Sequence, residues 1–394
     1  MQGAVRQESA RAQQGLELSI VLPCRNEAST VATCVSKGLA ALARLGVRGE
    51  VIVVDNGSTD GSAEIAARAG ARVVREHLVG YGNALKRGIR EARASRIVLA
   101  DADESYDLEE LDGFLAALDA GADLVMGSRF RGAIRPGAMP WLHRWIGNPL
   151  LSGVLRLLYG GTVSDAHCGM RALTKGAARR MRLRSDGMEF ASEMVVKAML
   201  ERMRVAEVPI TLHVDGREGR PHLRTFRDGW RHLRLMLLLS PTYVFVIPGV
   251  LFIIAGLLPL LVLGHGPRTL GPMSFDIHFL VLGSLLTILG FQILTTGLFA
   301  KAYSHAARLY PPDALLRAFL RHFTLERGLL LGGLLFLIGF LQDSSVLIDW
   351  ARRGFGSLDA VRPAIQASTA IIVGLQLIFS SFYLGLLRWA PPAR

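Results

Sequence analysis

The sequence predicts an α/β domain with a mostly parallel sheet, followed by a region of membrane-spanning helices. Short β-rich runs alternate with helix-length segments from Leu18 to Met126, and this alternation is typical of a parallel sheet with helices on both faces. Beyond Leu235 the chain is dominated by long runs of Leu, Ile, Val, Gly and Phe. Hydrophobic residues make up 51% of the 394 residues, which favours a membrane protein.

The α/β part contains five predicted strands, over residues 18–22, 50–54, 72–74, 96–99 and 123–126. In sheets of this type, ligands bind outside the carboxyl ends of the strands. Polar residues follow three of these ends, namely Arg25, Asn26 and Glu27, then Asp55 and Asn56, then the acidic cluster that begins at Asp101. We therefore expect three loops to converge on one crevice.

Four segments are predicted to cross a membrane, because each approaches the length of about 20 apolar residues that a span requires. They cover residues 243–263, 277–299, 328–348 and 364–387. The third segment is short and runs into Gln342 and Asp343, so a re-entrant segment remains an alternative there. Basic residues between 300 and 327 place that loop in the cytosol by the positive-inside rule.

The chain is accordingly expected to have four parts. A polar tail over 1–17 lacks the apolar core of a signal peptide. The α/β domain covers 18–215, a basic juxtamembrane loop and interfacial helix cover 216–241, and the transmembrane domain covers 242–394. We expect a multi-pass protein of the cell membrane whose α/β domain lies in the cytosol.

Two amphipathic segments are candidates for the membrane interface. Residues 224–237 place Phe226 and Trp230 near one helical face and several arginines on others, which favours an interfacial helix over a solvated linker. Residues 139–159 carry Trp141, Trp145 and several leucines. That segment suits an interfacial helix and an ordinary core helix equally well.

Charge and cysteine content narrow the class of partner. A net charge of +12 fits nucleic acid, anionic lipid or a phosphorylated substrate, and the apolar runs favour the last two. The three cysteines, Cys24, Cys34 and Cys168, form no CxxC pair and no zinc spacing. Neither a disulfide framework nor a structural zinc site is indicated, and a nucleic-acid partner is not expected.

The stretch IVLADADESYD places two carboxylates directly after a buried run. Asp101 and Asp103 form an Asp-x-Asp pair, whose spacing suits a hard divalent ion such as Mg²⁺ or Mn²⁺ together with diphosphate oxygens. Asp55 stands at a neighbouring strand end, where it is expected to contact a nucleoside. Asp60 is interpreted as a helix cap. The sequence thus predicts a site for a nucleotide diphosphate.

Six motifs, in order along the chain, resemble those of the family 2 glycosyltransferases, which have the GT-A fold. They are SIVLPCRNEAST, VIVVDNGSTDGS, GYGNALKRGI, DADESYD, LVMGSRF and DAHCGMRAL. Within the family, the chain is most similar to the polyprenyl-phosphate glycosyltransferases, the group of the dolichol-phosphate mannose and glucose synthases. The resemblance covers about Leu18 to Pro241. It implies inverting, metal-dependent transfer of a sugar from a nucleotide sugar, with a UDP-sugar favoured, to dolichyl or undecaprenyl phosphate at the cytosolic face.

The resemblance also implies a role for each matching residue. The nucleotide-binding residues would be Pro23, Arg25, Glu27, Asp55, Gly82, Asn83, Lys86, Asp101 and Ala102. The metal ligands would be Asp101 and Asp103, with Ser105 where mannose synthases have Gln, which leaves Glu104, Ser105 or water as the remaining ligand. The catalytic residues would be Asp103, Arg129, Asp165 and Arg171, and the acceptor phosphate would meet Arg129, Arg217 and Arg220. Glu189 and Glu193 would orient loops or touch the sugar.

Two other functions compete with this hypothesis. A processive polysaccharide synthase shares the amino-terminal fold and also has membrane helices, but its Gln-x-x-Arg-Trp motif is absent from the sequence. A catalytically silent membrane scaffold with the same fold is the second. Intact Asp55, Asp101, Asp103 and Arg129 argue against loss of activity. The interfacial and transmembrane helices would also support a homo-oligomer.

Overall fold

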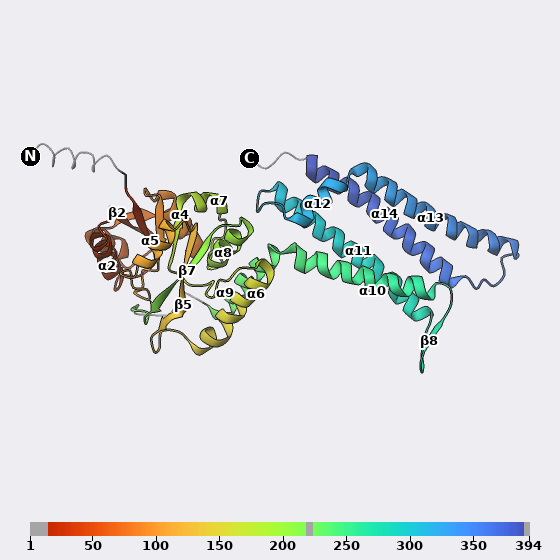
Figure 1. Ribbon diagram of the computed structural model, residues 1–394, viewed down its shortest axis with the longest axis horizontal. Coiled ribbons are helices and arrows are strands. Elements are labelled where there is room, and N and C mark those ends of the chain that lie inside the picture. Colours follow the sequence, from red (N-terminus) through yellow and green to blue (C-terminus); the bar gives the residue numbers. More distant parts are fainter. Residues whose placement is uncertain (1–14, 218–223, 390–394) are drawn as a thin grey trace, which may run out of the picture. The chain divides into compact units, whose positions relative to one another are not determined.

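The computed structural model describes residues 15–217 and 224–389. They form two compact units that divide after Leu238, and each unit is described by itself (Figure 1). Most of the predicted tail, residues 1–14, lies outside the described residues, as do 218–223.

A seven-stranded sheet forms the centre of the first unit, in the order β3-β2-β1-β4-β6-β5-β7. The strands are β1 (Leu18–Cys24), β2 (Gly49–Asp55), β3 (Arg72–Arg75), β4 (Arg96–Leu99), β5 (Leu124–Ile134), β6 (Arg171–Thr174) and β7 (Val205–Leu212). β6 runs antiparallel to both of its neighbours, and the other pairs are parallel. The five predicted strands and the mostly parallel sheet are confirmed, whereas β6 and β7 were not predicted.

Helices cover both faces of this sheet (Figure 1). They are α2 (Val31–Arg44), α3 (Ser62–Arg68), α4 (Tyr81–Glu91), α5 (Asp112–Asp119), α7 (Lys175–Met181) and α8 (Phe190–Leu200). Side chains alternate along β1, so Ile20 and Leu22 join the core that contains α2 and α5. Val21 points to the opposite face, where Gly88 lets α4 approach closely.

Two further helices of the first unit leave large apolar side chains in solvent. A π-helical turn over His143–Gly147 leads into α6 (Asn148–Tyr159), and α9 covers Thr225–Leu238; α6 and α9 pack against each other. Leu155 of α6 is buried, but Trp145 is 70% exposed and Phe226 of α9 is 85% exposed. Both segments that were predicted as candidates for the membrane interface are therefore helical and amphipathic.

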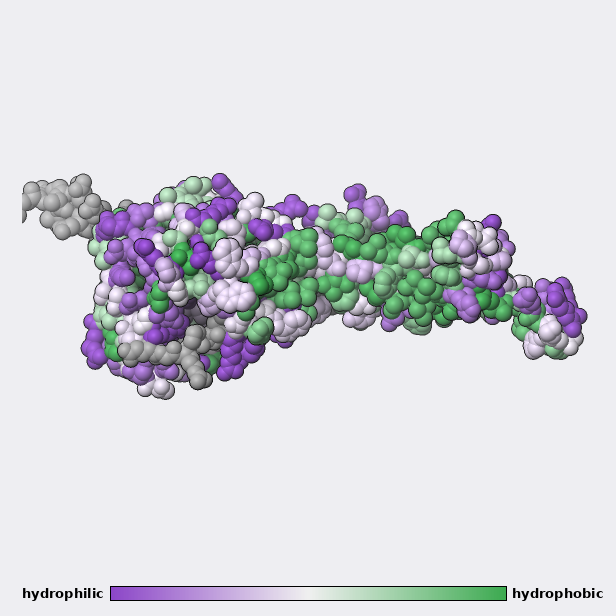
Figure 2. All heavy atoms as spheres, turned by 90° about the horizontal axis from the view of Figure 1, so that it is seen from below, coloured by the Kyte–Doolittle hydropathy of each residue, from purple (hydrophilic) through white to green (hydrophobic). Residues whose placement is uncertain are grey.

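The second unit is helical. Its helices are α10 (Ile247–Leu263), α11 (Ile277–Ala306), the short α12 (Ala314–His322), α13 (Leu325–Arg352) and α14 (Val361–Trp389), with a small hairpin of β8 (Arg268–Leu270) and β9 (Met273–Phe275). Four helical segments of the described chain are long and apolar enough to cross a membrane: Thr242–Leu263, Ile277–Ala306, Leu325–Arg352 and Val361–Leu387. α13 continues without interruption past Gln342 and Asp343, which favours a full span over a re-entrant segment. Figure 2 shows hydrophobic residues gathered over the surface of these helices.

Glycines bring the membrane helices together in pairs. A side chain on Gly256 of α10 would stand 2.4 Å from the backbone nitrogen of Thr287 in α11. One on Gly374 of α14 would stand 2.6 Å from that of Phe336 in α13. Small residues at such contacts let helix backbones approach closely, which is how helices associate in lipid.

The contact between α4 and the sheet gives a stability prediction. An added methyl group at Gly88 would lie 2.2 Å from Cγ1 of the buried Val21, so Gly88→Ala is expected to destabilise the first unit by about 1–3 kcal/mol. Gly153→Ala in α6 is the matched control, because nothing lies within 4 Å of its added methyl group. Denaturant unfolding of the detergent-solubilised protein measures both. Equal midpoints for the two variants would contradict this packing.

Candidate active site

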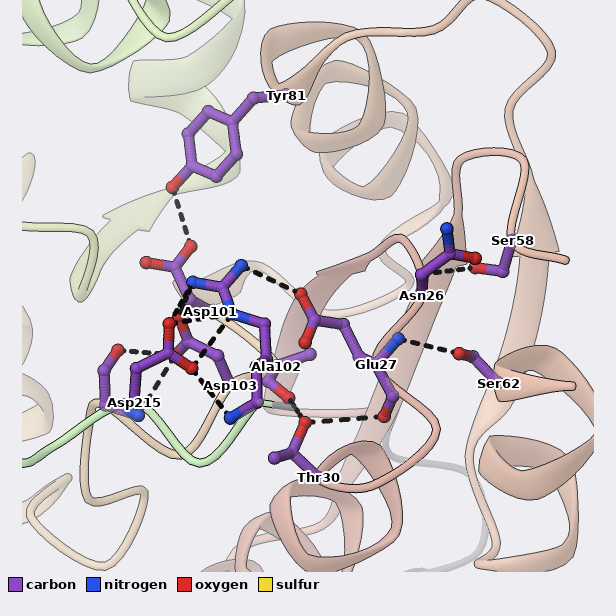
Figure 3. Close-up of polar contacts among 12 residues, drawn as sticks. Asn26, Glu27, Thr30, Ser58, Ser62, Tyr81, Asp101, Ala102, Asp103 and Asp215 are labelled. Atoms are coloured by element: carbon purple, nitrogen blue, oxygen red, sulfur yellow. Dashed lines mark hydrogen bonds and ion pairs between the residues drawn. The ribbon is translucent and has the colours of Figure 1, made fainter. Parts of the chain in front are cut away.

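The loops after β1 and β2 are fastened to each other at the carboxyl edge of the sheet. Cys24 pairs with Asp55 at the last position of the β1–β2 register, so the two loops start side by side. The backbone amide of Glu27 donates to Ser62 Oγ at 2.8 Å, and that of Ala28 donates to Asp60 Oδ2 at 3.0 Å (Figure 3 shows the Glu27 contact). Asp60 also accepts the amide of Ser62, the first residue of α3, but the N-cap residue of that helix is Gly61 and not the predicted Asp60.

Asp55, predicted to bind the nucleoside, is buried at the end of β2. Its Oδ1 accepts the backbone amide of Ser58 at 3.0 Å, so its carboxylate orients the turn that follows β2. The next residue, Asn56, donates to the carbonyl oxygens of Glu76 and Leu78. The loop before α4 is thereby held against the end of β2. Pro23 lies within β1, and Arg25 is exposed just beyond it.

The predicted nucleotide-site residues of α4 contact the segment before α8. The amide of Gly82 donates to the carbonyl oxygen of Asp186 at 2.9 Å, and that of Asn83 does so at 3.3 Å. Lys86 Nζ donates to the Asp186 carboxylate at 2.6 Å. A side chain at Gly82 would collide with the Ser185 carbonyl oxygen at 2.3 Å. The glycine is therefore explained by this packing.

Asp101 and Asp103 follow the end of β4, as predicted. Glu27, which follows β1, lies near them. Tyr81 Oη donates to Asp101 Oδ1 at 3.0 Å, and the Ser105 hydroxyl and amide both donate to Asp103 Oδ1. Burial, reinforced by the charge of Asp103, raises the pKa of Asp101 to about 7. Burial likewise raises the pKa of Glu27 to about 7. These carboxylates repel one another and attract a cation.

Arg217 supplies a positive charge to this cluster. Its Nη2 lies 3.0 Å from Asp103 Oδ2, and its Nη1 lies 3.2 Å from Glu27 Oε1. Its Nε donates to both carboxylate oxygens of Asp215, at 2.9 and 2.8 Å. Burial alone would lower the pKa of Arg217, but the hydrogen bonds to Asp215 and the charge of Asp103 raise it. The arginine therefore stays charged.

The donor set fits a divalent ion that is shared with a diphosphate. Among the described residues, no three Asp, Glu, His or Cys side chains converge to form a complete metal site. Mg²⁺ bound with a nucleotide takes one or two carboxylates and completes its coordination with phosphate oxygens and water. Asp101 and Asp103 meet that requirement. Ser105, one of the candidates for the remaining ligand, directs its hydroxyl to Asp103.

Arg129 and Asp165 form a buried ion pair on the other side of the sheet centre. Arg129 Nε and Nη2 each lie 2.7 Å from one oxygen of Asp165, whose side chain is 0% exposed. Arg171 is also buried and donates to three carbonyl oxygens, those of Cys168, Ala191 and Ala166. These contacts fix the DAHCGM segment. Both arginines were predicted as catalytic residues, and in the structure each makes hydrogen bonds that hold this segment in place.

The DAHCGM segment is packed directly against Asp101. A side chain at Gly169 would stand 2.4 Å from Asp101 Oδ2, so a larger residue there would displace the Asp101 carboxylate. His167 Nε2 and His232 Nδ1 lie 3.0 and 2.8 Å from Ser192 Oγ, which links this segment to α8 and α9. Burial lowers the pKa of His232 to about 4 and raises that of the Cys168 thiol to about 12. Both histidines hydrogen-bond to Ser192, and the Cys168 thiol donates to the carbonyl oxygen of Met170, so these contacts indicate packing and not nucleophilic catalysis.

Glu193, in the first turn of α8, holds the loop that precedes this helix. Its carboxylate accepts the amides of Arg184 and Ser185 and forms a 2.8 Å ion pair with Lys197, and both side chains of that pair are 3% exposed. This placement agrees with its predicted role in orienting loops. Glu189 lies at the start of α8.

Sequence reasoning missed Tyr81, Asp215 and Gly169 as site residues. A carboxylate two residues before Arg217 was the available signal for Asp215, and the glycine of DAHCGM was the signal for Gly169. No feature of the sequence pointed to Tyr81 apart from its place next to Gly82. Arg220, predicted to contact the acceptor phosphate, lies outside the described residues.

The buried Arg129–Asp165 pair gives a second prediction. Asp165→Asn removes one charge and leaves its buried partner uncompensated, so a loss of about 3–5 kcal/mol in the free energy of unfolding is expected. Asp112→Asn is the control, because Asp112 pairs with Arg44 at the surface and should cost less than about 1 kcal/mol. Chemical denaturation in detergent compares them. A similar loss in both variants would be inconsistent with the buried pair.

Comparison with known families gives two matches along the chain. Residues 19–182 match the model of glycosyl transferase family 2. Residues 298–388 match the model of the glycosyltransferase family 2 C-terminal transmembrane region. The two matches fall in different structural units, the first in the α/β unit and the second in the helical unit.

Comparison with curated proteins gives relatives in Haloferax volcanii. The chain is 40% identical over 371 residues to the low-salt glycan biosynthesis hexosyltransferase Agl6, which covers 94% of this chain and 89% of that protein. It is 32% identical over 216 residues to a dolichyl-phosphate hexose transferase, covering 54% of this chain and 89% of that protein. Among solved structures, glucosyl-3-phosphoglycerate synthase from Mycobacterium tuberculosis aligns with a TM-score of 0.46 and 22% identity, over 58% of this chain and 81% of that one.

Proposed function

This chain belongs to the family 2 glycosyltransferases, and we propose that it transfers a hexose from a nucleotide-diphosphate sugar to a polyprenyl phosphate at the cytosolic face of the membrane. One observation carries the proposal. Asp101, Asp103, Glu27 and Arg217 meet at the carboxyl edge of the sheet, and the described part of the chain also has four apolar helices of spanning length. An anionic donor and a lipid acceptor suit these two features.

The donor half of the reaction is assigned to the strand ends. Asp55 would contact the base or ribose, and a UDP-sugar is the favoured donor. Asp101 and Asp103 would hold Mg²⁺ or Mn²⁺ beside the diphosphate. A bound divalent ion would neutralise the charge that develops on the leaving diphosphate. Arg217, at the same edge, would contribute a second positive charge.

The acceptor half is assigned to the membrane side. An oxygen of the lipid phosphate attacks the anomeric carbon, the bond from that carbon to the diphosphate breaks, and the nucleoside diphosphate leaves with the electron pair. The configuration at the anomeric carbon is thereby inverted. A phosphate monoester is already anionic near pH 7, so no strong general base is needed. This half also draws support from the relative named as a dolichyl-phosphate hexose transferase.

The amphipathic helices α6 and α9 would bring the first unit to the lipid surface. The large exposed apolar side chains of these helices, and of the helical residues just before α6, are Trp141, Trp145, Leu150, Leu157, Phe226, Trp230 and Leu238. Tryptophans at the headgroup level and nearby arginines, such as the exposed Arg224 and Arg227, are typical of interfacial segments. A phosphate headgroup would then lie close to the site while its chain stays in the bilayer.

The product of the reaction tests the proposal. Membranes containing the protein are incubated with labelled UDP- or GDP-hexoses, Mn²⁺ and polyprenyl phosphate, and a lipid carrying a single sugar is expected in the organic extract. Polymer would instead support a processive synthase. No turnover with any donor would support a silent scaffold and overturn the proposal.

The metal assignment has a separate prediction. Asp103→Asn should lower turnover by more than about a hundredfold, since even partners that only orient a metal ligand contribute about 10- to 100-fold. Chelation with EDTA should abolish wild-type activity, and added Mn²⁺ should restore it. Asp119→Asn is the control, because Asp119 pairs with Arg96 at the opposite end of β4. An Asp103→Asn variant with full activity would contradict the assignment.

A further inference from the structure

Arg217 occupies a position that suits a cation in the carboxylate cluster. We propose that Arg217 is the resident counter-cation of this site and that a divalent ion displaces it from Asp103. Metal binding and the release of Arg217 are then one coupled event. The inference rests on the proposed metal site and adds to it a competitor from the chain itself.

The contacts of Arg217 come from three separate parts of the chain. Glu27 follows β1, Asp103 follows β4, and Asp215 lies on the same loop as the arginine. The Arg217 side chain is 17% exposed, so its charge is largely held by these groups and not by water. A guanidinium at hydrogen-bonding distance from carboxylates of two other loops acts as an internal cation.

Asp103 has one oxygen that can serve both the arginine and a metal. Its Oδ1 accepts the amide and hydroxyl of Ser105. Its Oδ2 is the atom that Arg217 holds at 3.0 Å. A metal ion that binds Oδ2 must therefore either replace the guanidinium or bind the same oxygen atom right beside it. Two cations at such separations repel each other strongly in a partly buried site.

Charge favours the exchange. Glu27, Asp101, Asp103 and Asp215 bring four acidic groups to the cluster. Arg217 contributes a positive charge in direct contact with three of them, and the buried Arg171 acts on Asp101 through its charge. A divalent ion brings twice that charge to the same oxygens. The incoming ion therefore offsets the carboxylate repulsion more completely than the arginine does.

Asp215 lowers the free-energy cost of the displacement. It binds the Nε edge of Arg217 with both oxygens and also accepts the Arg217 backbone amide at 3.0 Å. The amide of Gly216 donates to the Asp103 carbonyl oxygen at 2.9 Å, which keeps the loop beside the site. A displaced Arg217 thus keeps a partner and stays nearby. We assign Asp215 as a positioning residue that retains the guanidinium close to the phosphate groups arriving with the metal.

The coupling has a thermodynamic consequence. If metal binding frees Arg217, the metal raises the affinity of the site for a phosphate group that binds the freed guanidinium. The phosphate group must then raise the affinity for the metal by the same factor. The site would then be self-neutralised when empty and would offer a metal and an arginine together when loaded.

Mn²⁺ binding without nucleotide tests the proposal directly. The full chain in detergent is titrated with Mn²⁺, and the free ion is measured by its electron paramagnetic resonance signal. Arg217→Ala and Arg217→Gln should bind Mn²⁺ about ten- to a hundredfold more tightly than wild type, because the competing charged hydrogen bonds are gone. Arg131→Ala is the matched control, since it removes an equal charge from a pair with Glu207 and should leave the affinity unchanged.

A guanidinium titration separates displacement from a general charge effect. Added guanidinium ion should weaken Mn²⁺ binding by Arg217→Ala towards the wild-type value, and NaCl at the same ionic strength should not. Unchanged or weaker Mn²⁺ binding in both Arg217 variants would overturn the inference, as would equal effects of guanidinium and NaCl. If either of these results is found while the wild type still makes product, this inference fails and the proposed function stands. If the wild type binds no Mn²⁺, the metal site and this inference fail together.

Discussion

The structure of the site depends on the repulsion between buried carboxylates at one edge of the sheet. Glu27 and Asp103 are almost inaccessible to solvent, and Asp101 lies beside them. Burial removes the water that would otherwise screen their charges, so their mutual repulsion becomes a strong preference for a cation. Tyr81 and Ser105 satisfy individual oxygens without changing the charge, whereas Arg217 changes it. The loops after β1 and β4 and the segment after β7 are held together by that balance.

The parts of this arrangement that short-range pattern determines were predictable. The β-branched run before Asp55 and the apolar run before Asp101 identify buried strands, and parallel strands deliver the residues at their carboxyl ends to a single edge. Spanning helices are recognised from length and hydropathy alone, since lipid leaves few other structures available. These features fix the architecture and the acidic half of the site before any tertiary contact is known.

The remaining parts depend on contacts between distant residues. β6 is a four-residue strand, RALT, that exists because β4 and β5 flank it, and β7 contains Glu207 and Pro209, which weaken its strand pattern. Arg129 meets Asp165 across 36 positions, and Arg217 meets Asp103 across 114. Resemblance to a family pointed to these arginines as phosphate ligands. Their protein partners became visible only with the fold.

The glycine contacts between membrane helices determine an order of assembly. α10 with α11 and α13 with α14 are neighbours along the chain, so each pair can close as a hairpin while synthesis continues. Contacts between α11 and α14 must wait until the last helix has been made. The ion pair between Asp276 and Arg362, 86 positions apart, joins the two hairpins. The membrane region therefore consists of two helical hairpins that can each form separately, and α14 can dock onto α11 only after the last helix has been made.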